Sequence, residues 1–242
     1  MEEPVALVFE DTDKLAKGFS EFFMKLLDQK EGDFNVALSG GSTPKIWFDH
    51  LAKNHRLDID WNRVHLYWGD ERCVPPDNND SNYGMTKLHL IDPIQIPKTN
   101  IHRILGEKDP KESASLYANV LLNNLTKDAI PIFDLVILGM GEDGHTASIF
   151  PNEIDLWNSD ELCVVATHPT SGQQRISITG KVINNANSVA FLVAGENKTE
   201  RVKEIFDDEP HAAYYPASQV KPIHGTLHWF LDVSAAKLIN DD

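Results

Sequence analysis

The segment FDLVILG, residues 133–139, is apolar at every position except Asp134 and the closing glycine. A strand that is apolar on both faces is typical of the centre of a parallel sheet that is covered on both sides. We therefore expect this segment to form a central strand. The polar, glycine-rich segment GMGEDGHTASIFP, residues 139–151, continues from its end. It falls at the edge where open α/β sheets bind their ligands.

Strand-like and helical patterns alternate along the rest of the chain. Further strands are expected at residues 5–9, 34–38, 64–68, 163–166, 175–179, 188–195 and 227–232. Helices are expected from Thr12, taken as an N-cap, to about residue 27, from the SGGSTP segment to about residue 53, near residue 83, at 112–124, 179–185 and 198–206, and briefly at the C-terminus. This alternation predicts an α/β fold with a mostly parallel sheet and helices on both faces. We expect one domain over residues 1–242, because the long central loops suit an active site better than a linker.

Composition limits the function classes. The chain has 242 residues, 41% of them apolar, and a formal net charge of -15. It lacks the run of about 18 apolar residues that a membrane span needs, and its acidic N-terminal segment does not resemble a signal peptide. Cys73 and Cys163 are expected to be free thiols in a reducing cytoplasm. Nucleic acid is a poor partner for so acidic a chain, whereas a small anionic ligand needs only a local cationic pocket.

The first candidate site is the segment SGGSTP, which links an expected strand to an expected helix. Free N–H groups at a helix start and the helix dipole favour a bound phosphate. Glycines allow close backbone approach, and hydroxyls add donors. The candidate phosphate-binding residues are Ser39, Gly40, Gly41, Ser42 and Thr43. The alternative is a tight turn with an ordinary helix cap.

The second candidate site lies in residues 139–145, which match G-x-G-x-x-G after a strand. A dinucleotide site is disfavoured there, because Glu142 and Asp143 place negative charge where a pyrophosphate would lie. His145 suits a general base near neutral pH. Asp143 either orients the imidazole or caps the turn, and the backbone from Gly141 onward offers N–H donors. The alternative for His145 is a purely structural role.

The third candidate site is WGDER, which ends an expected strand and continues as a loop rich in Pro, Asn and Asp. Asp70 and Arg72 suggest a polar pocket, in which Arg72 could hold a carbonyl, a carboxylate or a phosphate. The alternative is a surface cluster of ion pairs. Arg175 and Lys198 are candidate phosphate cations. Motifs for a serine hydrolase, a zinc site and a Walker A loop are absent from the sequence.

Taken in order, these segments resemble the 6-phosphogluconolactonases of the glucosamine-6-phosphate isomerase/6-phosphogluconolactonase superfamily. The resemblance rests on ALSGGSTP, WGDERCVPPDNNDSNYGM, FDLVILGMGEDGHTASIFP, RISITGKVINNA and LVAGENK, and it spans about residues 35–231. It implies a Rossmann-like fold without a dinucleotide, metal or organic cofactor. It also implies hydrolysis of 6-phospho-D-glucono-1,5-lactone, a small sugar-phosphate lactone, in the oxidative pentose phosphate pathway. The family's catalytic histidine falls on His145 and its active-site arginine on Arg72, with phosphate contacts on residues 39–43, Arg175 and Lys198.

The competing interpretation is the sister enzyme, glucosamine-6-phosphate deaminase. The deaminase pattern has an acidic residue five positions after the histidine, where this chain has Phe150, and DEY in place of Asp70-Glu71-Arg72. Deamination with isomerisation needs several proton transfers and hence additional carboxylates. A non-catalytic sensor of sugar phosphates is the alternative outside enzymes. Phe150 and Arg72 favour the lactonase.

Overall fold

The protein is described here by a computed structural model that covers residues 4–125 and 130–239. Its centre is a six-stranded sheet, with the strand order β1-β9-β8-β5-β2-β3, in which every neighbouring pair is parallel. Its strands are β1 (Val5–Phe9), β2 (Phe34–Leu38), β3 (Val64–Trp68), β5 (Leu135–Leu138), β8 (Ser188–Val193) and β9 (Thr226–Asp232). The expected mostly parallel α/β sheet is confirmed.

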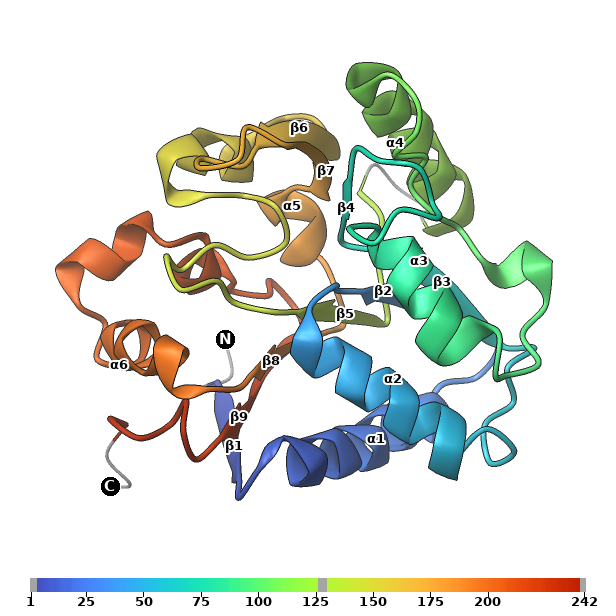
Figure 1. The fold of residues 1–242 in the computed structure, drawn as a ribbon, viewed down its shortest axis with the longest axis horizontal. Coiled ribbons are helices and arrows are strands. Elements are labelled where there is room, and N and C mark those ends of the chain that lie inside the picture. The colour runs from blue at the N-terminus through green and yellow to red at the C-terminus, as the bar shows by residue number, and fades with distance from the viewer. Residues whose placement is uncertain (1–3, 126–129, 240–242) are drawn as a thin grey trace.

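The helices lie on both sides of this sheet. In Figure 1, α1 and α2 lie below the sheet, while α5 lies above it together with a smaller sheet. The α-helices are α1 (Thr12–Gln29), α2 (Ser42–Asn54), α3 (Asn82–Thr86), α4 (Pro110–Leu125), α5 (Gly180–Ile183) and α6 (Thr199–Phe206). A π-helical segment covers Lys87–Ile91, and 3-10 segments cover Lys98–Asn100, Pro151–Asn158, Glu196–Lys198, Pro210–Tyr214 and Pro216–Gln219.

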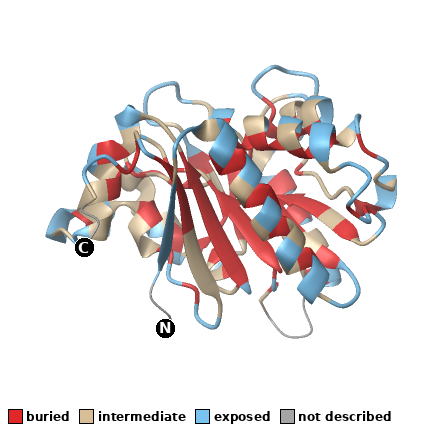
Figure 2. Cartoon of the chain, turned by 90° about the horizontal axis from the view of Figure 1, so that it is seen from below, coloured by how far each residue is buried: buried red, intermediate tan, exposed pale blue. Residues whose placement is uncertain are grey.

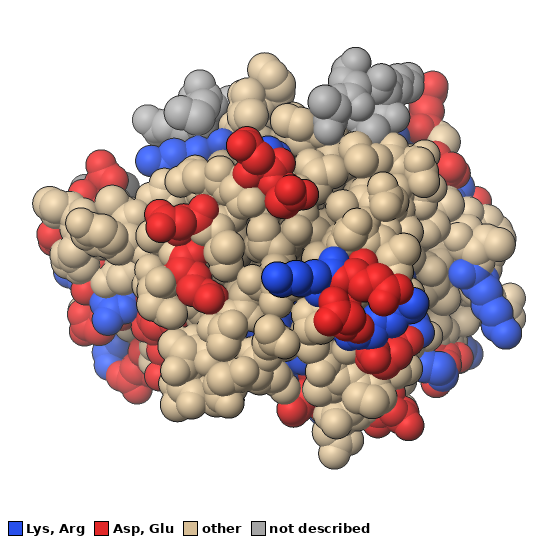
Figure 3. Space-filling view, turned by 90° about the horizontal axis from the view of Figure 1, so that it is seen from above, with Lys and Arg blue, Asp and Glu red and all other residues tan. Residues whose placement is uncertain are grey.

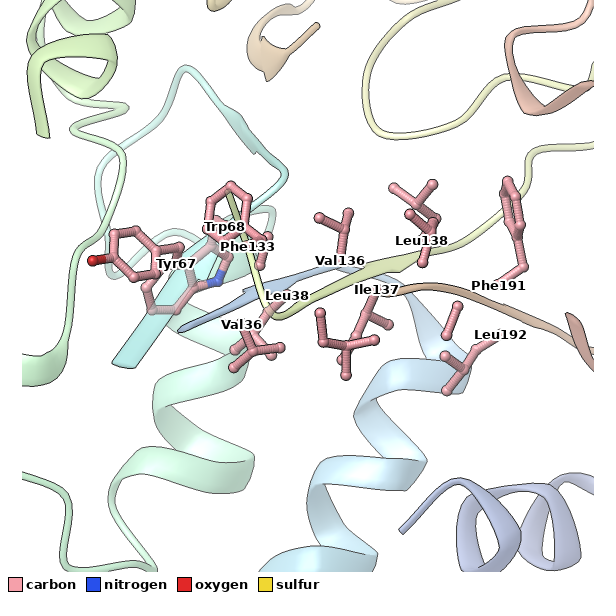
Figure 4. Packing of buried hydrophobic residues seen from close by; sticks show 14 of the residues in the cluster. Val36, Leu38, Tyr67, Trp68, Phe133, Val136, Ile137, Leu138, Phe191 and Leu192 are labelled. Atoms are coloured by element: carbon pink, nitrogen blue, oxygen red, sulfur yellow. The ribbon is translucent and has the colours of Figure 1, made fainter. Parts of the chain in front are cut away.

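The apolar strand β5 lies in the core. All four of its residues are buried, and Figure 4 shows Val136 and Leu138 on the opposite side of the strand from Ile137. This burial on both faces explains why the segment carries no alternation of polar and apolar residues. The edge strand β1 is mostly exposed (Figure 2), as its position at the end of the sheet requires.

A second sheet was not expected as a separate unit. It is antiparallel, has the order β4-β7-β6, and consists of β4 (Asp70–Arg72), β7 (Gln174–Ile178) and β6 (Cys163–Thr167). Gly69 connects the two sheets, because its N–H donates to the carbonyl of Leu38 and its carbonyl accepts from Ile178 N–H. The chain thereby passes from β3 directly into β4. The second sheet places Arg72 opposite Arg175 in the register.

The helix expected at 179–185 covers only Gly180–Ile183, the strand expected at 188–195 ends at Val193, and three further predictions also differ from the structure in detail. The side chain of Asp11, not Thr12, caps α1, accepting from Lys14 N–H at 2.7 Å. The segment 133–139 contributes only Leu135–Leu138 to the sheet. The expected terminal helix is wrong over residues 233–239, which form turns, and its last residues lie outside those described. There Asp232 Oδ1 accepts from Ala235 N–H, a side-chain bond that favours a turn.

The state of the cysteines follows the sequence prediction, and the surface carries charge of both signs. Cys73 and Cys163 are both free thiols. The face in Figure 3 carries acidic and basic side chains intermixed, separated by wide areas without charge. Among the described helices, none has the length and apolar character to cross a membrane.

Candidate active site

A cavity of about 240 Å³ opens at the carboxyl edge of the parallel sheet. Strands β2, β5 and β8 end here, and the residues that follow each of them line it. The lining residues are Ser39, Gly40, Gly41, Ser42, Thr43, Pro44, Asp70, Arg72, Asn82, Gly139, Met140, Gly141, His145, Ala147, Arg175, Leu192, Val193, Ala194 and Lys198. The sequence-predicted site residues all lie in this list except Asp143. The three candidate segments, together with Arg175 and Lys198, therefore meet at one cavity.

Asp143 reaches the cavity through His145. Its Oδ1 lies 2.6 Å from His145 Nδ1 and also accepts the backbone N–H of His145 at 3.1 Å. Burial alone would raise the pKa of Asp143, but the hydrogen bonds and charge of His145 outweigh it and hold this pKa at about 2. The carboxylate is thus ionised at neutral pH and orients the imidazole, as well as closing the turn.

Gly141 provides the space that the imidazole occupies. A Cβ on Gly141 would lie 2.1 Å from His145 Nδ1 and 2.6 Å from Asp143 Oδ1. Its N–H donates to the carbonyl of His145, and Gly144 N–H donates to the carbonyl of Gly141. The backbone donors of both glycines are therefore already used within the turn.

The start of α2 forms the opposite side of the cavity. Its N-cap, Gly41, has φ of +105° and supplies no side-chain cap, and the first turn contains no acidic residue. A Cβ on Gly40 would lie 1.9 Å from Asn82 Oδ1, so only glycine allows this close approach. Helix starts of this kind present free N–H groups and a positive dipole end to an anion.

Two arginines face the cavity from the second sheet. Arg72 and Arg175 are register partners, and Arg175 is only 9% exposed. The Nε atoms of both are buried, and neither has a hydrogen-bond partner among the described residues. Burial, followed by the charge of Arg72, lowers the pKa of Arg175. Buried donors without partners are costly, and an anionic ligand would satisfy them.

Lys198 is the third cation of the cavity. It immediately precedes α6, and burial lowers its pKa, whereas the nearby carboxylates of Glu142 and Asp143 raise it. These neighbours place Lys198 on the same side of the cavity as the turn that carries His145. The cations therefore fall into two groups, an arginine pair and a single lysine.

The side chains of Asp70 and Glu71 are both buried, so the segment Asp70-Glu71-Arg72 is not a cluster of surface ion pairs. Asp70 lines the cavity and accepts from Ser148 Oγ at 2.5 Å and from Asn82 Nδ2 at 3.3 Å. Glu71 points elsewhere and accepts the backbone N–H groups of Arg72, Asn82 and Tyr83 and the hydroxyl of Ser81. Burial raises the pKa of Glu71, against these hydrogen bonds. Glu71 therefore shapes the loop that carries the site.

Sequence reasoning missed several cavity residues. Asn82 lies between Gly40 and Asp70, and Leu192, Val193 and Ala194 line the cavity from the end of β8. The three residues at the end of β8 follow from the rule that ligands bind where parallel strands end. That rule is applied above only to residues 133–139. Asn82 gives no comparable signal in a loop rich in polar residues.

Phe150 is completely buried beside the site. Its ring centroid lies 4.7 Å from that of His145, and the guanidinium carbon of Arg175 lies 5.5 Å from it. No carboxylate occupies this position. Among the described residues, no three His, Cys, Asp or Glu side chains are grouped so that they could hold a metal ion.

The fold and cavity define an α/β protein with a histidine–carboxylate pair beside a cationic pocket. The profile of the family described as glucosamine-6-phosphate isomerases/6-phosphogluconolactonase matches residues 10–229. A 6-phosphogluconolactonase of Haemophilus influenzae is 42% identical over 230 residues, which cover 94% of each chain. A solved 6-phosphogluconolactonase from Trypanosoma brucei is 25% identical, with a TM-score of 0.90, covering 99% of this chain and 100% of its own.

The chain therefore belongs to the glucosamine-6-phosphate isomerase/6-phosphogluconolactonase family, and the resemblance stated from its motifs is confirmed. It is an enzyme of the lactone hydrolase type, as those motifs predict. A solved monomeric glucosamine-6-phosphate deaminase shares the fold at a TM-score of 0.82 and 17% identity, covering 97% of this chain and 99% of its own. Since the fold is common to both reactions, the residues of the cavity must distinguish them.

Proposed function

We propose that this enzyme hydrolyses 6-phospho-D-glucono-1,5-lactone to 6-phospho-D-gluconate in the oxidative pentose phosphate pathway. The observation that carries the proposal is the meeting of the His145–Asp143 pair with two buried, unpartnered guanidinium donors at one cavity. The pair suits activation of water, and the donors suit a phosphate or a developing oxyanion. The relatives that carry the name 6-phosphogluconolactonase support the same substrate.

The substrate phosphate binds at the start of α2 in this proposal. The N–H groups and hydroxyls of Ser39, Ser42 and Thr43 surround it, and Arg175 and Lys198 supply positive charge from the other sides of the cavity. The two glycines between them keep the backbone close to the anion. This arrangement anchors one end of the substrate and leaves the lactone ring beside His145.

His145 is the general base. Asp143 accepts the Nδ1–H of the ring, so Nε2 carries the lone pair that takes a proton from water. The water oxygen forms a bond to the lactone carbonyl carbon, and the carbonyl oxygen becomes an oxyanion. The ester C–O bond to the ring oxygen then breaks, and His145 returns the proton to that leaving oxygen. No covalent enzyme intermediate is required.

Arg72 is the better candidate to stabilise the oxyanion. The backbone N–H groups of Gly141 and Gly144 already donate to carbonyl oxygens, whereas Arg72 Nε has no partner among the described residues. The other end of this guanidinium is held in place, because Nη1 donates to the carbonyl of Asp80 at 2.6 Å. A fixed donor of this kind costs no reorganisation when charge develops.

The deciding experiment measures two reactions side by side. The protein should accelerate the hydrolysis of freshly generated 6-phosphogluconolactone above its spontaneous rate. It should release no ammonia from glucosamine 6-phosphate, because Phe150 stands where an additional proton carrier is expected. Ammonia release without lactone hydrolysis would replace the proposal with the deaminase. Inactivity in both assays, with binding of either sugar phosphate, would favour a sensor.

A further inference from the structure

Phe150 connects the cavity to a second histidine that has no role in the mechanism above. The ring centroid of His168 lies 5.2 Å from that of Phe150, with the rings edge to face at 73°. The same phenyl ring contacts His145 and lies under the guanidinium of Arg175. Neither Phe150 nor His168 is among the described residues that line the cavity. His168 can therefore influence the cavity through the phenyl ring or through its charge.

The hydrogen bonds of His168 define its protonation state. It begins the turn between β6 and β7, and its Nδ1 accepts the backbone N–H groups of Thr170 at 3.3 Å and Ser171 at 3.2 Å. A ring nitrogen that accepts hydrogen bonds carries no proton, so the neutral ring has its proton on Nε2. Protonation of Nδ1 would replace both hydrogen bonds with a contact between donors.

The charged groups around His168 also favour its neutral form. Arg175 on β7, Arg72 on β4 and the His145–Asp143 pair after β5 all act on it. Burial, followed by the charges of Arg175 and His145, lowers the pKa of His168, and Asp143 alone in this group raises it. A proton on His168 would therefore enter a region that already holds two guanidinium groups.

The turn that begins at His168 is joined to the loop of Arg72. His168 N–H donates to the carbonyl of Gln173 at 3.0 Å, and Gln173 Nε2 donates to Asp80 Oδ2 at 3.2 Å. The carbonyl of the same Asp80 accepts from Arg72 Nη1. Hydrogen bonds thus connect this turn to Arg72, and the Phe150 ring connects it to His145 and Arg175.

We propose that neutral His168 is a positioning residue for the reaction, because it holds the Phe150 ring against His145 and Arg175, and that its protonation in acid weakens this arrangement. This inference rests on the proposed lactonase function. It predicts two protons in the acid limb of the rate profile. One inactivates the general base, and the other protonates His168 and loosens the turn.

Two variants test whether the reaction needs both the ring of His168 and its acceptor in the turn. His168→Asn keeps an oxygen able to accept the two turn N–H groups but removes the ring and the charge. His168→Phe keeps an aromatic ring but removes the acceptor and the charge. We expect each to lower kcat by roughly tenfold at neutral pH, since small displacements of a catalytic group cost this much or more. KM for the phosphorylated lactone should change less. His224→Asn is the matched control, because His224 is exposed and outside the cavity lining.

The dependence of kcat/KM on pH in acid distinguishes a positioning role of His168 from a merely structural one, which would leave this dependence unchanged. In a plot of log kcat/KM against pH, the acid side should have a slope greater than one in wild type and in His224→Asn. Its slope should be one in both His168 variants. Variants with wild-type kcat and a wild-type acid limb would overturn the proposal.

NMR titration of the wild-type protein without substrate tests the contact by itself. The ¹⁵N shifts of His168 should show the Nε2–H form, and the His145 ring signals should move when His168 takes up its proton. Independent titration of the two rings would overturn the positioning role. Coupled titration in a protein without lactonase activity would instead refute the proposed function alone.

Discussion

At the scale of single residues, Nδ1 of His145 is held by Asp143, and the proposed mechanism uses Nε2 to activate water. Replacement by alanine removes the base but leaves the phosphate contacts, so His145→Ala should lower kcat by about 10²–10⁴-fold. KM should change much less. Steady-state rates on 6-phosphogluconolactone, corrected for spontaneous hydrolysis, check this, with circular dichroism as the folding control. Turnover near the wild-type rate in folded His145→Ala would remove this residue from the mechanism.

Phe150 offers the sharpest test of the sister reactions. It is fully buried against His145, Arg175 and His168, so Phe150→Glu places a carboxylate in a space that an apolar ring fills. A buried charge without full compensation costs several kcal/mol, and pairing with Arg175 would withdraw that cation from the substrate. We expect impaired lactonase activity and no ammonia release from glucosamine 6-phosphate, because Arg72 and its loop still differ from the deaminase pattern.

The matched control at this position is Phe150→Leu, which keeps an apolar side chain without the ring. It should retain more lactonase activity than Phe150→Glu. Equal activities of the glutamate variant and wild type would show that Phe150 is peripheral. The choice of reaction would then depend on Arg72 and His145.

At the scale of elements, the turn after β5 tolerates a methyl group at one glycine and not at another. Gly141→Ala would drive a Cβ into the His145–Asp143 pair, at 2.1 Å from Nδ1. At Gly139 the nearest atom is Ser39 Oγ at 3.8 Å, an ordinary contact. We expect kcat of Gly141→Ala to fall by about 10²-fold or more, as for other misplaced catalytic groups, and Gly139→Ala to remain near wild type. Equal effects of the two substitutions would mean that this spacing does not control the histidine.

The elements also show how far the sequence could predict the structure. The parallel strands carry local signals, since burial on both faces leaves continuous apolar runs such as residues 135–138. In the second sheet, β6 and β7 carry a local signal, at residues 163–166 and 175–179, but β4 does not, because it has only three residues and pairs with β7 about a hundred positions later. The sequence identifies Asp70 and Arg72 as site candidates. That these two side chains line the cavity while Glu71 points elsewhere depends on the pairing of β4 with β7. The contact between Phe150 and His168 likewise arises from tertiary packing and has no local signal in the sequence.

At the scale of the whole molecule, the cavity concentrates positive charge in a chain whose formal net charge is -15. Arg72 and Arg175 face each other across two strands, and each Nε is left without a partner among the described residues. Such a site lowers the stability of the free protein in exchange for function. A bound sugar phosphate supplies acceptors, with its phosphate at Arg175 and its C1 oxygens at Arg72, so ligand binding should raise the free energy of unfolding of the folded chain.

The size of this effect follows from mass action. The product 6-phosphogluconate at 100 times its Kd should stabilise the folded state by about 2.7 kcal/mol, which raises Tm by roughly 5–10 °C for a domain of this size. Arg175→Ala removes a charge-assisted contact worth about 1.5–3 kcal/mol, or roughly 10–150-fold in Kd. At the same product concentration, its Tm should therefore rise by only about 1–5 °C.

Two controls make the thermal measurement specific. Unphosphorylated gluconate should leave Tm unchanged in both proteins, because it lacks the group that the cavity is proposed to anchor. Lys221→Ala, at an exposed lysine outside the cavity lining, should respond to 6-phosphogluconate as wild type does. Equal shifts with gluconate and 6-phosphogluconate would refute the phosphate site. A full shift in Arg175→Ala would assign the phosphate to the start of α2 and Lys198, and would leave both guanidinium groups to the lactone carbonyl.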